Sequence, residues 1–233
     1  MRRNPRPLPT LPTGGKGIKT VLFDLDDTLL ASARARQRAR RLLRRYGVDP
    51  RRFARADSRW WLRYAHGECT MQELRLGRLA DAGLEGEPAL EADAAYRAVA
   101  NQIHRRLGAE RLLRAVRAAG LRTAILTNGT SDPQRPKAER FAHLVDAILV
   151  SEEVGHTKPD SRAFEAALKA VGGRPARAAM VGDRLEVDVE GALAAGFALA
   201  VWVTERRRNH LDPRVVRVRA LRGVLPVILA TSR

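Results

Sequence analysis

Short apolar runs alternate with helical patterns over most of the chain. The runs lie at 18–24, 122–126, 147–150, 178–181, 198–203 and 215–218. Apolar runs of this length that are bounded by turn residues predict buried strands. Helical patterns around 109–119, 160–171 and 186–195 separate several of these runs. This alternation is typical of an α/β fold with a parallel sheet.

The pattern changes between the first two runs, where helical periodicity dominates from about Leu29 to Leu107. Glycine or proline interrupts it near 47–50, 66–67 and 83–88, so we expect four or five helices there. The chain is therefore predicted to comprise a loose N-terminal tail at 1–17, a core domain at 18–30 and 108–233, and an inserted all-helical domain at 31–107.

The chain is strongly basic, with a formal net charge of +17. Only five of its 43 basic residues are lysine, which indicates a compositional bias toward arginine. The arginines between 34 and 45 flank an apolar stripe at helical spacing, so we expect a solvated helix face around a buried stripe. The stripe consists of Ala35, Ala39, Leu42 and Tyr46. Charge alone leaves a nucleic-acid partner open, but no zinc-finger, aromatic-platform or helix-turn-helix pattern supports one.

No apolar run approaches the length that crosses a membrane. The opening residues are rich in arginine, proline and glycine and lack the apolar core of a signal peptide, so we expect a soluble cytoplasmic protein. The single cysteine, Cys69, cannot form a disulfide within the chain, and no Cys/His cluster has zinc-ligand spacing. We expect Cys69 to pack inside the inserted domain.

Reactive polar side chains follow four of the predicted strands. They are Asp24 and Asp26 after the first, Thr127 and Asn128 after the second, Lys158 after the third, and Asp183 and Asp188 after the fourth. Ligands of parallel sheets bind beyond the carboxyl ends of the strands. Two carboxylates one residue apart at such an end suit a hard cation and a phosphoryl group.

Each of these residues also has an ordinary structural interpretation. Asp26, Asp27 and Thr28 are suited to capping the helix that follows them. Thr127, Asn128 and Asp183 are typical turn residues, and Lys158 can be a surface charge. The occurrence of suitable chemistry at all four strand ends favours a functional site, and a lysine there is notable because lysine is rare in this chain.

These four segments, in this order, resemble the four motifs of the haloacid dehalogenase superfamily of hydrolases, in the branch with an all-helical, C1-type cap after the first motif. The resemblance covers residues 18–230. Outside the motifs it includes 66–78, 150–155 and 191–196. One departure lies within 137–146, a segment that is slightly short and lacks the customary glycine. The resemblance implies a Rossmann-like parallel sheet flanked by helices, with 31–107 as the cap.

The same resemblance implies a Mg²⁺-dependent phosphatase that forms an aspartyl-phosphate. Asp24 is then the nucleophile, and Asp26 protonates the leaving group and later accepts a proton from water. The haloacid dehalogenases lack a carboxylate at the position of Asp26, so phosphoryl transfer is favoured. Thr127, Asn128 and Lys158 are expected to bind the phosphoryl group. The implied metal ligands are Asp24, the backbone carbonyl of Asp26, Asp183 and Asp188, the last as an outer ligand or as the partner of Lys158.

Substrate choice is expected to reside in the cap, which closes over the site. Candidate residues that face the site are Trp60, Trp61, Arg63, Tyr64, His66 and Arg78. The alternative for most of them is that they pack the core of the cap itself. The expected partner is a small phosphorylated metabolite, with sugar phosphates, phosphoglycolate and nucleoside monophosphates all open. A nucleic-acid-associated phosphatase, a basic binding protein and a 2-haloacid dehalogenase are the alternatives.

Overall fold

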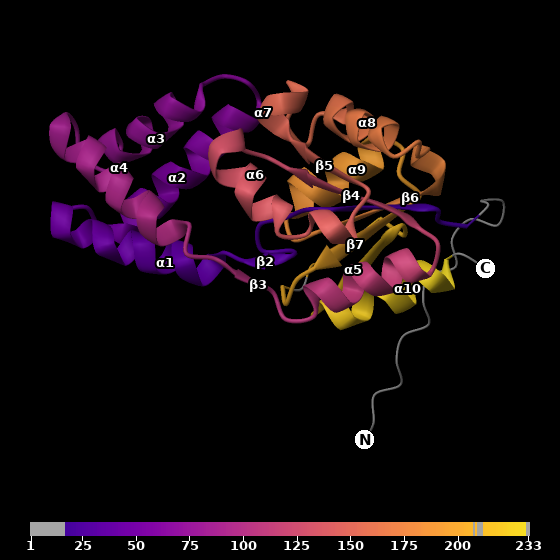
Figure 1. The fold of residues 1–233 in the computed structure, drawn as a ribbon. Helices are drawn as coiled ribbons and strands as arrows, with labels where there is room; N and C mark the ends of the chain where they lie inside the picture. Colours follow the sequence, from indigo (N-terminus) through magenta and orange to yellow (C-terminus); the bar gives the residue numbers. More distant parts are fainter. Residues whose placement is uncertain (1–16, 207, 209–211, 232–233) are drawn as a thin grey trace.

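A six-stranded parallel sheet forms the centre of the α/β domain (Figure 1). The computed structural model describes residues 17–206, 208 and 212–231. The strand order is β5-β4-β1-β6-β7-β8, and every neighbouring pair is parallel. The strands are β1 (Thr20–Phe23), β4 (Arg122–Thr127), β5 (Ala147–Val150), β6 (Ala178–Gly182), β7 (Leu199–Val203) and β8 (Val215–Val218). The predicted α/β fold with a parallel sheet is confirmed.

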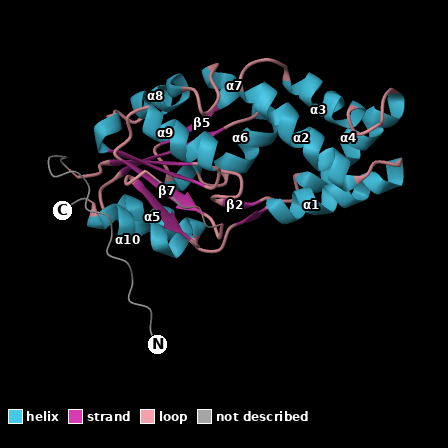
Figure 2. Cartoon of the chain, turned by 180° about the vertical axis from the view of Figure 1, so that it is seen from behind, coloured by secondary structure: helices cyan, strands magenta, loops and turns pink. Residues whose placement is uncertain are grey.

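Helices cover both faces of this sheet (Figures 1 and 2). They are α5 (Ala109–Ala118) and α10 (Val224–Ala230) on one face, and α8 (Ser161–Ala170) and α9 (Gly191–Ala194) on the other. Alternate residues of β1 serve the two faces, because Val21 and Phe23 join the cluster with α5 and α10 whereas Leu22 joins the cluster with α8 and α9. Burial on both faces explains why β1, β6 and β7 are nearly continuous apolar runs that do not alternate with polar residues.

Shorter elements connect the strands to these helices. They are α6 (Ser131–Glu139), α7 (Ser151–Val154), η2 (Ala142–Leu144), η3 (Pro175–Arg177), η4 (Leu185–Glu190) and η5 (Leu221–Gly223). The helix predicted around 186–195 begins as the π-helical segment η4 and continues as α9. The segment 137–146, where the sequence departs from the family pattern, contains the end of α6 and the turn η2.

The cap is a separate helical layer inserted between β1 and β4 (Figure 1). It comprises α1 (Ala33–Leu42), η1 (Leu43–Tyr46), α2 (Pro50–Ala65), α3 (Met71–Ala80) and α4 (Glu87–Ala100). Two of its helices have side-chain caps at their N-termini. Asp49 accepts hydrogen bonds from the first N–H groups of α2, and Thr70 and Glu73 form a capping box at the start of α3. Phe53, Tyr96 and their apolar neighbours give the cap a core of its own.

Helix α1 shows the expected solvated arginine face, but only Ala35 and Ala39 of the predicted stripe are buried, whereas Leu42 and Tyr46 are half-buried. Ala35 and Ala39 are buried where α1 packs on α4, whereas Arg34, Arg38 and Arg41 are exposed. The arginine-rich segment is therefore built as an amphipathic helix whose small residues allow close packing.

A two-stranded ribbon that the sequence did not predict joins the cap to the α/β domain. β2 (Leu30–Ala31) pairs antiparallel with β3 (His104–Arg105), so the two chain segments that cross between the domains lie side by side. Two residues per strand are too few to produce a period-two pattern, which is why the ribbon left no signal.

The predicted N-terminal tail, 1–17, lies outside the described residues except for Gly17. The carbonyl oxygen of Gly17 accepts a hydrogen bond from the side chain of Arg177 at 3.3 Å, which holds the chain where it enters β1. Among the helices of the described residues, none combines the length and the apolar character needed to cross a bilayer.

Candidate active site

Strand β1 lies between β4 and β6, so the polar residues that follow these strands meet at one edge of the sheet. Phe23 pairs in register with Ile125 of β4 and Val181 of β6. Asp24 follows directly, and its N–H donates to the carbonyl oxygen of Val181 at 2.9 Å. The strand order reverses beside β1, because the chain goes to β4 and β5 on one side before it returns to β6 on the other. Such a reversal is where parallel sheets bind ligands.

Lys158 is the centre of the hydrogen-bonded group at this edge. Its Nζ lies 2.8 Å from Oδ1 of Asp24 and 2.7 Å from Oδ1 of Asp188, and its side chain is only 1% exposed. Burial disfavours the ammonium form, but the two carboxylates outweigh it and raise the pKa of Lys158. The lysine is therefore held as a buried cation between carboxylates from two different strand ends.

Three carboxylates gather around this lysine. Asp24, Asp183 and Asp188 each have an oxygen atom within 4.8 Å of the others. Burial raises the pKa of Asp24 to about 7 despite the opposing charge of Lys158, and burial together with Asp24 and Asp188 raises the pKa of Asp183 to about 8. Such shifts are expected where buried carboxylates repel one another and a compensating cation is needed.

Two oxygen atoms of this group are suited to bind that cation. Oδ2 of Asp24 and Oδ1 of Asp183 are buried, and neither has a hydrogen-bond partner among the described residues. The oxygens of Asp188 are both engaged, one by Lys158 and the other by the backbone N–H of Arg184 at 3.0 Å. Carboxylate oxygens are the ligands that hard divalent cations prefer, so Asp24 and Asp183 fit a metal better than Asp188 does.

The carboxylate of Asp26 lies at the same strand end but has different partners. Its oxygens accept hydrogen bonds from the hydroxyl of Ser32 at 2.6 Å and from Nε2 of Gln134 at 2.9 Å. The Nζ atom of Lys137 lies 3.9 Å from Oδ2. Burial favours a higher pKa for Asp26, but Lys137, the two hydrogen bonds and Arg36 outweigh it and lower the pKa.

Thr127 and Asn128 follow β4 and are tied to the same group. Nε2 of Gln134 lies 3.2 Å from the Thr127 hydroxyl and 2.8 Å from the Asn128 carbonyl oxygen. The side chain of Asn128 is bound to the backbone of Lys158, accepting from its N–H at 2.9 Å and donating to its carbonyl at 2.7 Å. Asn128 thus fixes the loop that carries the central lysine, and its side chain is engaged mainly in this structural role.

Asp27 caps helix α1, as the structural interpretation predicts, but Thr28 does not. One Asp27 oxygen accepts hydrogen bonds from the N–H groups of Ser32 (2.9 Å) and Ala33 (2.6 Å), and the other pairs with Arg36. The hydroxyl of Thr28 is buried without a hydrogen-bond partner in the described part of the chain. The expectation of a Thr28 cap is wrong because Asp27 already bonds the first free N–H groups.

The last strand end is shaped by a glycine and a tryptophan. A Cβ atom on Gly182 would lie 2.4 Å from Cβ of Asp188, so only glycine lets that side chain pack against β6. The indole N–H of Trp202 on β7 donates to the carbonyl oxygen of Asp183 at 2.9 Å. These contacts hold Asp183 and Asp188 in fixed positions, as a preorganised site requires.

Arg78 does not face the carboxylates at the strand ends, contrary to its place among the candidates. Its side chain is buried in the cap, where it bonds Asp57 (2.8 Å) and Asp93 (3.3 Å) and lies over the rings of Phe53 and Tyr96. A guanidinium with two carboxylate partners and two aromatic faces has no need of a ligand. Arg78 therefore holds the helices of the cap together.

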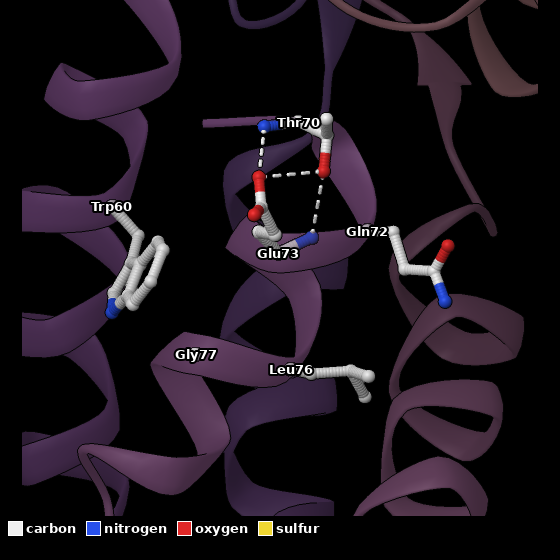
Figure 3. Close-up of a pocket in the computed structure, with 6 residues that line it drawn as sticks. All are labelled: Trp60, Thr70, Gln72, Glu73, Leu76 and Gly77. Carbon is white, nitrogen blue, oxygen red and sulfur yellow. Dashed lines mark hydrogen bonds between the residues drawn. The ribbon is translucent and has the colours of Figure 1, made fainter. Parts of the chain in front are cut away.

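Trp60 also belongs to the interior contacts of the cap. Figure 3 shows its indole beside Gly77, and a Cβ atom on Gly77 would lie only 2.1 Å from the ring. The pocket drawn there is lined by Trp60, Thr70, Gln72, Glu73, Leu76 and Gly77. None of these residues comes from the strand ends that carry the carboxylates, so this pocket is a feature of the α2–α3 contact.

Tyr64 is the cap candidate with a contact to the α/β domain. Burial raises the pKa of its hydroxyl, and a hydrogen bond with the side chain of Ser151 acts in the opposite direction. Ser151 in turn bonds the backbone N–H of Gly129 at 2.9 Å, in the loop after β4. Trp61 packs edge-on against Tyr64, whereas Arg63 and His66 are exposed beside Glu68.

Comparison with known proteins supports the family suggested by this arrangement. A family model described as haloacid dehalogenase-like hydrolase matches residues 18–196. The chain belongs to this family. Among solved structures, the magnesium-bound HAD-hydrolase YfnB from Bacillus subtilis aligns with a TM-score of 0.74 at 23% identity. The alignment covers 91% of this chain and 99% of the YfnB chain. This chain therefore shares its α/β fold with YfnB, and the predicted resemblance to the haloacid dehalogenase superfamily is confirmed.

Several relatives within the haloacid dehalogenase-like hydrolases are phosphatases. Phosphoserine phosphatase from Thermus thermophilus is 46% identical over 121 residues, which are 50% of this chain and 48% of that protein. Glyceraldehyde 3-phosphate phosphatase from Methanothermobacter thermautotrophicus is 34% identical, over 42% and 45% of the two chains. This chain thus spans about half the length of these two relatives. Pyrimidine 5'-nucleotidase YjjG from Escherichia coli is 31% identical over 82% and 88%.

Proposed function

We propose that this protein hydrolyses a small phosphomonoester through a covalent aspartyl-phosphate on Asp24. The observation that carries the proposal is the pair of short contacts from Lys158 to Asp24 and Asp188, beside an Asp24 oxygen that has no hydrogen-bond partner in the described residues. A carboxylate held in one orientation with a buried cation beside it is arranged to attack an anionic phosphorus. The relatives named phosphatases support the same reaction class.

Mg²⁺ fits this site, and Asp24, Asp183 and the backbone carbonyl of Asp26 would hold it. The fit rests on the unpartnered oxygens of Asp24 and Asp183 and on the raised pKa values of both groups. When bound, the ion reduces the repulsion between an anionic nucleophile and an anionic substrate. Asp188 is assigned to positioning Lys158, because both of its oxygens already have partners.

The first half-reaction forms the bond between an Asp24 oxygen and phosphorus and breaks the bond from phosphorus to the ester oxygen. Asp26 gives a proton to the departing oxygen, so the product leaves as an alcohol. This step requires the anionic substrate beside Asp26 to raise the pKa that Lys137 and the two hydrogen bonds lower in the free site. In the second half-reaction, Asp26 takes a proton from water, the water oxygen attacks phosphorus, and Asp24 is released as a carboxylate with free phosphate. Thr127, Lys158 and the backbone at Asn128 hold the phosphoryl oxygens as their charge redistributes.

Haloacid dehalogenases of known structure have the same fold, so the fold alone does not distinguish dehalogenation from phosphoryl transfer. The L-2-haloacid dehalogenase RSc1362 has a TM-score of 0.74 at 19% identity and covers 91% of this chain. The proposal for phosphoryl transfer depends on Asp26, whose carboxylate sits next to the nucleophile strand and is held by Ser32 and Gln134. A dehalogenase has no leaving oxygen that requires a proton, so it has no use for this group.

Asp26→Asn tests the proposal. We expect kcat for alkyl phosphates to fall by about 10²–10⁴-fold, because the amide cannot transfer the proton. Hydrolysis of para-nitrophenyl phosphate in Mg²⁺ should suffer less in its first step, since nitrophenolate leaves without protonation. The neighbouring variant Asp27→Asn is the matched control and should affect chiefly the stability of α1. Equal kcat losses in the two variants on an alkyl phosphate would contradict the assignment of Asp26.

A further inference from the structure

We propose that Lys137 binds a second anionic group on the substrate, an oxyanion carried two or three bonds from the ester oxygen. This inference rests on the proposed function, because it takes Asp26 as the residue beside the leaving oxygen. It narrows the substrate class to phosphomonoesters of hydroxy acids and of other alcohols that carry a nearby oxyanion.

The ammonium group of Lys137 has incomplete hydrogen bonding. Within the described part of the chain, Nζ makes one hydrogen bond, to the neutral Oε1 of Gln134 at 3.2 Å. Its carboxylate neighbour, Oδ2 of Asp26, lies 3.9 Å away, beyond hydrogen-bond distance. An ammonium carries three N–H donors, so two remain for a ligand.

Lys137 is also shielded from water, which makes the missing acceptors costly. Its side chain is 15% exposed, whereas Lys19 and Lys169 are exposed surface residues. Of the lysines in the described ranges, Lys19 and Lys169 are exposed, Lys137 is partly buried, and Lys158 is buried and bonded to two carboxylates. A partly buried cation whose carboxylate neighbour lies beyond hydrogen-bond distance is a suitable place for an anionic ligand.

The position of Lys137 places such a ligand on the leaving-group side of the ester. Asp26 is assigned to the leaving oxygen, so the first carbon of the alcohol must pass next to its carboxylate. A separation of 3.9 Å from Asp26 to Nζ is comparable to two or three bonds of a short chain. A carboxylate or phosphate at that point on the substrate would replace the missing acceptors of Lys137.

Arg36 adds positive charge on the same side from the cap. It pairs with Asp27. Burial lowers the pKa of Lys137 and Lys137 lowers the pKa of Asp26, and the charge of Arg36 adds to both effects. Its side chain is 34% exposed, and a guanidinium has five N–H donors. Two cations thus lie near Asp26: Lys137 from α6 of the α/β domain and Arg36 from α1 of the cap.

The test measures competition against para-nitrophenyl phosphate hydrolysis in Mg²⁺ with two matched pairs of compounds. Phosphoglycolate is paired with 2-hydroxyethyl phosphate, and 3-phosphoglycerate with glycerol 1-phosphate, so each pair differs in one carboxylate. We expect the unaltered enzyme to bind the anionic member of at least one pair about 10- to 100-fold more tightly.

Lys137→Gln should remove this preference, while the exposed control Lys169→Gln should retain it. Restoration of part of the preference by Lys137→Arg would show that charge is what matters. If Lys137→Gln weakens both members of each pair equally, the lysine only positions Asp26 and the inference is overturned, although the proposed function stands. An unaltered enzyme without any preference for the anionic compounds overturns it as well. Absence of para-nitrophenyl phosphate hydrolysis would instead reject the proposed function.

Discussion

Asp24→Asn should reduce the hydrolysis of para-nitrophenyl phosphate by at least about 10⁴-fold, the scale of loss seen when an enzyme nucleophile is removed. An asparagine amide is too poor a nucleophile to form the acyl phosphate, and it offers the metal one neutral oxygen in place of a carboxylate. The loss should appear in kcat measured at saturating Mg²⁺.

The fold of this variant should be preserved, because asparagine has nearly the same shape as aspartate and can still accept a hydrogen bond from Lys158. Thermal unfolding provides the check that the protein is intact. Asp27→Asn again serves as the control, since it removes a carboxylate three residues from Asp24 that only caps α1 and pairs with Arg36. Mg²⁺-dependent turnover that survives in Asp24→Asn would show that another group attacks the phosphorus.

Lys158→Met should lower both activity and stability. Removal of the ammonium leaves the carboxylates of Asp24 and Asp188 buried beside each other without their cation. Loss of one partner from a buried ion pair typically costs about 3–5 kcal/mol, and we expect a decrease of that order in the free energy of unfolding without Mg²⁺. Loss of phosphoryl stabilisation should reduce kcat by about 10²–10³-fold.

Urea denaturation and steady-state kinetics on the same preparation separate the two effects of this substitution. Lys169→Met is the matched control, because Lys169 is exposed on α8 and should change neither quantity measurably. Mg²⁺ should restore part of the lost stability by taking the place of the missing cation, but it should not restore kcat. A Lys158→Met protein as stable and as active as the parent would contradict the central position given to this residue.

The fold was accessible from the sequence because its signals are local. The strands are short, mainly apolar runs bounded by turn residues, and two helices of the cap, α2 and α3, begin at the capping residues Asp49 and Thr70. The β2–β3 ribbon left no signal because two residues do not define a period. The π-helical turn η4 was equally invisible, since it differs from an α-helix only in which backbone groups pair.

The convergence of the site residues also followed from the sequence, because carboxyl ends of neighbouring parallel strands lie at one edge. The partners of Asp26 did not follow, since Ser32, Gln134 and Lys137 reach it only through the orientation of α1 and α6. The sequence does contain one indication of these partners, because Gln134 and Lys137 lie one helical turn apart shortly after Thr127. Arg78 was misassigned because a local pattern cannot tell a buried ion pair within the cap from a ligand contact across domains.

Trapping the covalent intermediate is the most direct measurement of the central claim. Enzyme mixed with Mg²⁺ and a phosphomonoester and then quenched into sodium borohydride should have its acyl phosphate reduced, which converts the side chain at position 24 to that of homoserine. Peptide mass spectrometry should find this change at Asp24, only with substrate present, and not in Asp24→Asn. Active enzyme that is modified at another residue, or at none, would contradict an aspartyl-phosphate on Asp24.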